Sequence, residues 1–136
     1  MINGVILQKL QTLDQVLAEL RGLGSVSAGR LRDDWLVRRA VERDAQVLVE
    51  VVIDVCQRLI SLADQTPAPT SADAIERCIQ LGALSDWDAY RQMVQFRNFV
   101  VHRYDHIDET VLAEVLNSHL PDFERFRDEV LAYAQH

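Results

Sequence analysis

Cysteine, proline and glycine are scarce in this sequence of 136 residues, which contains two, three and five of them. Cys56 and Cys78 lie far apart and form no C-x-x-C unit, which argues against a disulfide framework and a cysteine-based zinc site. We expect two reduced, buried thiols. Few glycines and prolines, together with 49% hydrophobic residues, exclude a disordered, collagen-like or low-complexity chain.

Basic residues are also few: the sequence has 14 Lys and Arg and 21 Asp and Glu, which gives a net charge of −7. This sign excludes a protein that coats phosphate backbones non-specifically, so any contact with nucleic acid must be local. No uncharged stretch of about 18 residues is present to span a bilayer, and the N-terminus does not resemble a signal peptide. We expect a soluble, cytoplasmic protein with no membrane partner.

Apolar residues recur at helical spacing along the chain. One narrow stripe predicts a first helix ending near Gly22 and Gly24; it consists of Ile6, Leu10, Leu13, Leu17 and Leu20. After a linker over Gly22–Gly29, the absence of Pro and Gly from Arg30 to Thr66 predicts one long helix or two collinear ones. Its wide apolar arc suggests burial on two sides, against its own bundle and against a second subunit.

Four further start signals follow the prolines that end this long segment. Thr70–Asp73 resembles a capping box for a short helix closed by Gly82, and Ser85–Asp88 repeats the start signal. Asp108 can cap another helix, which Pro121 should break and restart. The prediction is an all-α protein: a single domain over residues 1–136, built as an antiparallel bundle of four to six helices.

The segment 93–106 differs from the solvated faces of the other helices, because it places titratable and hydrogen-bonding groups in an apolar helix. Asn98 and His102 are four positions apart and share a face, so the amide can orient the imidazole. Arg97 and His102 lie about 140° apart around an ideal helix, so one copy would not aim both at the same atom. Two copies meeting across a homodimer would, which predicts a composite site at a subunit interface.

The run from Arg97 to Tyr104 reads R-N-F-V-V-H-R-Y, which has the R-x4-H-x-Y form of the HEPN superfamily. Its setting in residues 95–108, and the break at His119–Asp122, resemble the HepT-like branch, and the resemblance extends over nearly the whole chain. It implies the toxin of a type II toxin–antitoxin pair, an endoribonuclease that acts without metal or cofactor. It also implies an antitoxin that is an MntA-like minimal nucleotidyltransferase and transfers AMP to the motif tyrosine, here Tyr104.

The residue types suit this chemistry. RNA supplies its own nucleophile, the 2′-OH, so cleavage needs a base, an acid and a cation near the phosphorus. His102 can serve as base or acid at neutral pH, since its reference pKa is about 6.5. Arg97 stays protonated and presents a planar fork to phosphate oxygens, so we expect it to stabilise the transition state. Asn98 is expected to support His102, and the predicted product is a 2′,3′-cyclic phosphate.

Other interpretations remain open at this point. His102 and His106 are four apart and invite a metal site with Asp105 or Asp108, although Arg103 stands where a zinc protease would carry glutamate. A non-enzymatic bundle that only docks a nucleotidyltransferase is the alternative function, and the RNA substrate is either mRNA or tRNA. A basic cluster can be a salt-bridged solvated face or an RNA track, the former being favoured; its members are Arg30, Arg32, Arg38, Arg39 and Arg43.

Overall fold

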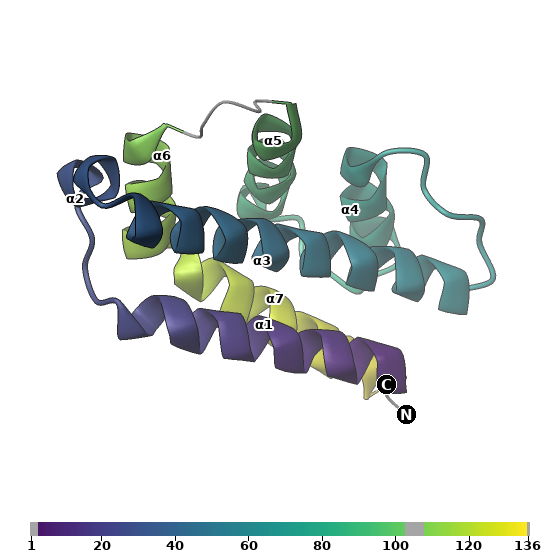
Figure 1. Ribbon diagram of the computed structural model, residues 1–136. Helices are drawn as coiled ribbons and strands as arrows, with labels where there is room; N and C mark the ends of the chain where they lie inside the picture. Colours follow the sequence, from purple (N-terminus) through teal and green to yellow (C-terminus); the bar gives the residue numbers. More distant parts are fainter. Residues whose placement is uncertain (1–2, 103–107, 136) are drawn as a thin grey trace.

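The computed structural model describes residues 3–102 and 108–135, and for residues 98–102 it describes the backbone alone. These ranges contain helices and turns and no strand, which confirms the all-α fold (Figure 1). The elements in chain order are α1 (Gly4–Gly22), α2 (Ala28–Asp33), α3 (Trp35–Leu62), α4 (Ser71–Gln80), α5 (Asp88–His102), α6 (Glu109–Glu114), the π-helical η1 (Val115–His119) and α7 (Leu120–Ala134). Helices α1 and α3 run antiparallel, α7 lies beside α1, and α4, α5 and α6 stand across α3.

The first helix forms as its apolar spacing predicts. The Asn3 carboxamide caps it by accepting from the amide of Val5 at 2.9 Å. All five residues of the predicted stripe are buried, and the helix ends at Gly22, shortly before Gly24 at φ +69°.

The long segment after the linker is two helices, and the expectation that they are collinear is wrong. Figure 1 shows α2 almost end-on while α3 crosses the view. The break is at Asp34, which is extended (φ −117°, ψ 93°) and whose carboxylate accepts from the amide of Val37 at 3.2 Å. A capping aspartate thus starts a new helix without Pro or Gly, which is why the absence of these residues did not predict the break. At the other end α3 stops at Leu62, ahead of Pro67.

Three of the later start signals are confirmed and one needs correction. Thr70 caps α4 and Asp108 caps α6, as expected. Ser85, however, contacts Glu129 of α7, and α5 begins only at Asp88. Pro121 lies in the first turn of a new helix, α7, as expected, where its missing N–H costs nothing; the chain reaches this helix from α6 through the π-helical η1 without a gap.

The buried apolar side chains of the described helices form one cluster. Helix α3 packs on α1 with one side and on α4 and α5 with the other, so its wide apolar arc is largely covered within the chain. The arc therefore does not require a second subunit, and the homodimer stays a prediction. Cys56 and Cys78 are both free and buried, as expected. Among the described residues, no helix is long and apolar enough to cross a membrane.

Candidate functional site

The N-terminal end of α5 is held by one carboxylate of α7. Glu129 accepts hydrogen bonds from the Ser85 amide at 2.6 Å, from the Tyr90 hydroxyl at 2.7 Å and from the Arg125 guanidinium at 2.9 Å. Burial alone would raise the pKa of Glu129, but these hydrogen bonds outweigh it and the pKa is lowered. The Tyr90 side chain is fully buried, so α5 is anchored where it begins.

A second clamp ties α5 to α4. The Arg91 guanidinium binds both carboxylate oxygens of Glu76, at 2.5 and 3.1 Å, and Asp86 at 2.7 Å. Bidentate pairs of this kind hold orientation as well as distance. Together with the Glu129 contacts, this clamp sets the direction in which α5 presents the residues of its C-terminal half.

Arg97 continues the buried stripe of α5. It lies seven positions after Tyr90 and four after Met93, both of which are buried, so it belongs to the inward side of the helix. The Arg97 side chain is half-buried, and its Nε–H is buried without a hydrogen-bond partner among the described residues. Leaving a buried charged donor unsatisfied costs about 1–3 kcal/mol or more. A donor in this position suits an anionic ligand such as a phosphate oxygen.

The other predicted site residues are placed in part or not at all. Asn98 and His102 belong to α5, which ends at His102, but their side chains are not among those described. Tyr104 lies outside the described residues, as do Asp105 and His106. The backbone keeps Asn98 and His102 one helical turn apart, whereas the meeting of Arg97 and His102 at one phosphate remains a prediction.

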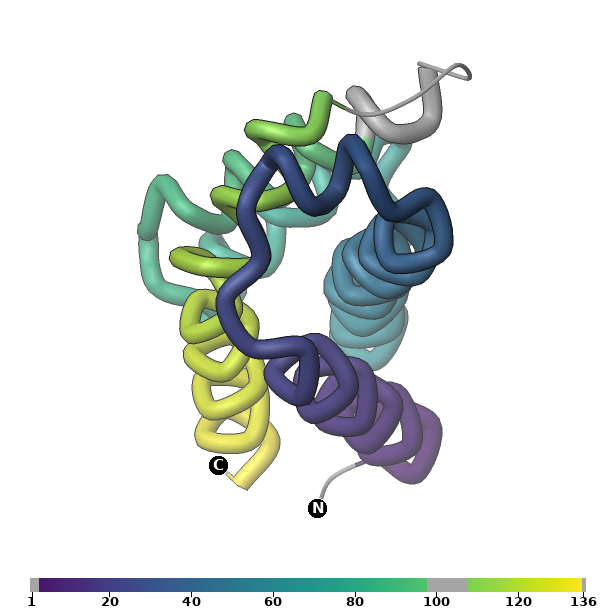
Figure 2. The backbone as a smooth tube through the Cα atoms, turned by 60° about the vertical axis from the view of Figure 1, so that its left-hand side comes forward, coloured from purple at the N-terminus to yellow at the C-terminus, as the bar shows by residue number. Residues whose placement is uncertain are grey.

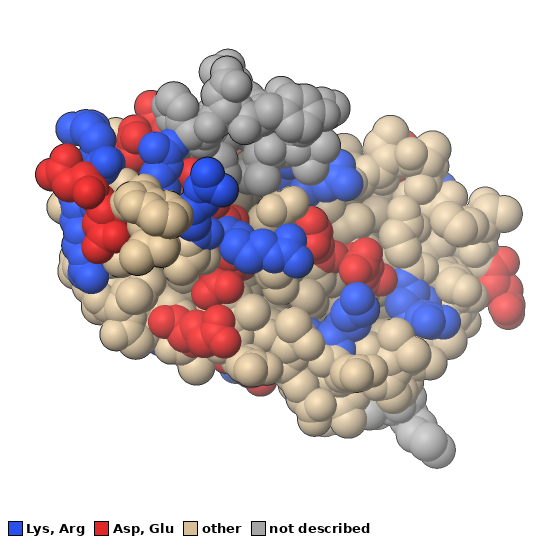
Figure 3. All heavy atoms as spheres, in the orientation of Figure 1, with Lys and Arg blue, Asp and Glu red and all other residues tan. Residues whose placement is uncertain are grey.

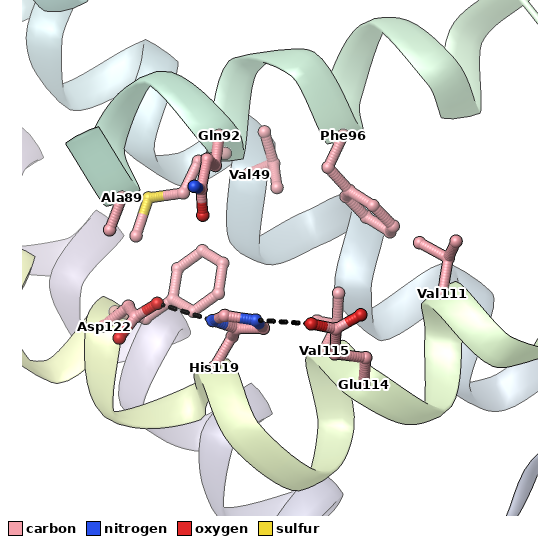
Figure 4. A pocket seen from close by; sticks show the side chains of 11 residues that line it. Val49, Ala89, Gln92, Phe96, Val111, Glu114, Val115, His119 and Asp122 are labelled. Atoms are coloured by element: carbon pink, nitrogen blue, oxygen red, sulfur yellow. Dashed lines mark hydrogen bonds and ion pairs between the residues drawn. The ribbon is translucent and has the colours of Figure 1, made fainter.

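A pocket of about 200 Å³ lies between α5 and the α6–η1–α7 segment (Figure 4). Its walls are mainly apolar, formed by Val49, Met93, Phe96, Val111, Val115 and Phe123. His119 lies at one edge: its Nδ1 is 2.9 Å from an oxygen of Asp122 and its Nε2 is 3.5 Å from an oxygen of Glu114.

His119 was not predicted from the sequence to be a functional residue. The sequence feature that could have indicated it is the spacing of three positions between His119 and Asp122 at a predicted helix start, which lets the two side chains meet. Since both ring nitrogens face carboxylates, the imidazole is held in place and joins α6 to α7. The pocket lies on the side of α5 that carries Met93 and Phe96, and Arg97, about 100° around the helix from Phe96, is not among its lining residues.

The structure describes only some of the side chains that could bind a metal ion. Among the residues described, no group of three His, Cys, Asp or Glu side chains is arranged to hold a metal ion. The side chains of His102 and His106, on which the alternative metal site depends, lie outside the described residues.

Comparisons with known proteins agree on one family. The family described as "Ribonuclease HepT-like" matches residues 13–130. The chain is 25% identical over 134 residues to a protein of Shewanella oneidensis named mRNA nuclease HepT, covering 96% of this chain and 99% of that protein.

Solved structures show the same fold. A tri-AMPylated Shewanella oneidensis HEPN toxin in complex with an MNT antitoxin superimposes with a TM-score of 0.84 at 22% identity, covering 96% of this chain and 99% of that one. The protein YutE of Bacillus subtilis, described as cytosolic and of unknown function, reaches a TM-score of 0.81 at 15% identity, with 96% and 88% covered.

Proposed function

Because this chain belongs to the HepT-like ribonuclease family, we propose that it is the toxin of a type II toxin–antitoxin pair and a metal-independent endoribonuclease. The observation that carries the proposal is Arg97: a buried guanidinium N–H without a described partner, inside the R-x4-H-x-Y motif. A structural arginine at that depth would be expected to have its donors satisfied.

The reaction is transesterification by the RNA itself. His102 of one protomer removes the proton of the 2′-OH, whose oxygen attacks the adjacent phosphorus. The bond from phosphorus to the 5′-oxygen breaks, and the same residue of the second protomer donates the proton that the leaving oxygen takes up. The products are a 2′,3′-cyclic phosphate and a 5′-hydroxyl. Arg97 stabilises the charge that develops on the phosphorane oxygens, and Asn98 orients the imidazole of His102.

The active form is a homodimer. The reason is the angle of about 140° between Arg97 and His102 on an ideal helix, which a second, symmetry-related copy of the motif makes up for. Each phosphate then meets groups from both protomers.

Regulation acts on Tyr104. The proposed partner is an MntA-like nucleotidyltransferase antitoxin, consistent with the tri-AMPylated HEPN toxin whose fold this chain shares. AMP on the tyrosine hydroxyl adds bulk and negative charge close to His102 in the sequence, and both oppose the entry of an RNA phosphate.

The decisive experiment is expression in a host that lacks the antitoxin. The wild-type chain should arrest growth, whereas His102→Ala and Arg97→Ala should not, and the RNA from arrested cells should carry new 2′,3′-cyclic phosphate ends. Sequencing of those ends then separates mRNA from tRNA as the substrate.

Two outcomes would contradict the proposal. Equal tolerance of the wild-type and His102→Ala chains would favour a non-enzymatic module that docks a nucleotidyltransferase. Loss of cleavage by the purified protein after chelation, restored by Mg²⁺, would refute the metal-independent mechanism.

A further inference from the structure

Helix α3 begins with two large apolar side chains in solvent. Trp35 is 66% exposed and Leu36 is 64% exposed. Of the aromatic side chains that the structure describes, Trp35 alone is exposed. The other described tryptophan, Trp87, packs edge-on against Tyr90 and beneath the Arg125 guanidinium. The indole of Trp35 therefore has a different role from the packing role of Trp87.

Four exposed arginines lie close to Trp35 in the sequence, on α2 and on the first turns of α3. They are Arg30, Arg32, Arg39 and Arg43, which with Trp35 we call the Trp35 patch. Figure 3 shows blue side chains gathered over this end of the molecule, with red ones between them.

Some of the acidic residues that lie between these arginines in the sequence already bind other groups. Asp34 caps α3, and Arg38 binds both Glu42 at 2.9 Å and Glu109 at 3.2 Å. Over residues 30–44, five arginines stand against four acids, so the local charge is 5 − 4 = +1 in a chain of −7. Asp44 interacts with Glu19 of α1 as well as with Arg43. The predicted salt-bridged face is thus present at Arg38, while the segment 30–44 keeps a net charge of +1.

The patch lies next to α6, and the motif helix α5 ends on the same side of α3 as α6. Arg38 reaches Glu109, the first residue of α6, and Trp35 is three positions before Arg38 and so on the same side of α3. Figures 1 and 2 both show α2 beside α6 at the end of the molecule where α3 begins, and Figure 1 shows α5 ending on the same side of α3 as α6.

We infer that the Trp35 patch binds the single-stranded RNA that flanks the cleaved phosphodiester, with one base stacked on the indole of Trp35 and neighbouring phosphates bound by Arg32 and Arg39. The inference rests on the proposed ribonuclease function. Aromatic stacking combined with cationic side chains is the usual means of holding single strands without reading their sequence. Protein docking is less favoured, because Trp35 and Leu36 offer two apolar side chains where a stable protein interface buries about 800 Å² per partner.

The test is direct binding of a 12-nucleotide 2′-O-methyl RNA, which cannot be cleaved because its nucleophile is blocked. Fluorescence anisotropy should show a Kd about tenfold higher for Trp35→Ala, as expected for the loss of one stacked base. Arg39→Ala should weaken binding and reduce the slope of log K against log salt by about 0.7. All the changed side chains are exposed, and circular dichroism should confirm that the variants remain folded.

The same helix supplies matched controls. Leu62→Ala removes an apolar side chain that is 54% exposed, and Arg58→Ala removes an exposed arginine, both from the far half of α3. Arg58 lies about 28 Å along the helix axis from Arg39. Neither control should change the Kd or its salt dependence.

Parent-like RNA binding by both Trp35→Ala and Arg39→Ala would overturn the inference. So would variants that bind RNA normally but no longer co-purify with a co-expressed nucleotidyltransferase antitoxin, because the surface would then belong to a protein partner. The outcome is separable from that of the proposed function. Cleavage with unaffected binding in the patch variants refutes only this inference, whereas patch-dependent binding without any cleavage refutes only the ribonuclease assignment.

Discussion

Replacing Tyr90 by Phe tests whether the carboxylate of Glu129 holds the start of α5. The substitution removes one hydroxyl whose oxygen is 2.7 Å from Glu129 and keeps the buried ring, which packs against Trp87 and Phe126. Since the cavity left behind is small, the expected loss is that of one hydrogen bond to a charged group, about 1.5–3 kcal/mol.

The loss can be measured by urea and thermal unfolding at pH 7. For a chain of 136 residues, the unfolding entropy corresponds to about 3.5 °C in Tm per kcal/mol, so Tm should fall by about 5–10 °C. Tyr133→Phe, a half-buried tyrosine of α7, is the matched control and should stay within about 0.5 kcal/mol of the parent.

A double-mutant cycle isolates the pair. Tyr90→Phe and Glu129→Gln should show a coupling energy of about 1 kcal/mol or more, because they share one hydrogen bond. A stability of Tyr90→Phe equal to that of the Tyr133→Phe control, or strict additivity in the cycle, would refute the idea that this contact anchors α5.

Three further perturbations probe charges and caps. Because the pKa of Glu129 is lowered in the folded protein, its ionised carboxylate stabilises the fold above the unfolded-state pKa, and this stabilisation is lost as the pH falls through the folded-state pKa. The difference in unfolding free energy between the parent and Glu129→Gln should therefore become smaller below about pH 4. Burial, and after it repulsion from Glu19, raises the pKa of Asp44 to about 6, so the ionised carboxylate destabilises the fold. Asp44→Asn should therefore stabilise the protein by up to about 1 kcal/mol above pH 6 and should no longer do so near pH 4. An Asp44→Asn variant that is less stable than the parent at pH 7.5 would contradict this. Asp34→Ala removes the cap of α3 and should cost about 1 kcal/mol in urea unfolding, with Asp33→Ala as a near-neutral control.

Most of the helices can be predicted from the sequence, because the interactions that start and orient them are local. The buried stripe of α1, the capping hydroxyl of Thr70 and the capping carboxylate of Asp108 each act within a few positions of the backbone groups that they satisfy. The part of the motif from Arg97 to His102 lies on α5, a helix that the sequence predicted, whereas Tyr104 lies outside the described residues and the site as a whole stays a prediction. The proposed role of Arg97 as a phosphate-binding cation is supported by its Nε–H, which is buried without a hydrogen-bond partner among the described residues. The spacing of residues in the sequence could not predict this.

What the sequence by itself determined is thus the set of helices, most of their caps and the residues that share each face, because backbone hydrogen bonds and caps join near neighbours in the chain. Only the tertiary structure decided that Ser85 binds Glu129 and that Arg38 reaches Glu109. It also decided that α3 covers its wide apolar arc within the chain. These contacts join residues far apart in the chain, and they form only when whole helices pack, so no local pattern carries them.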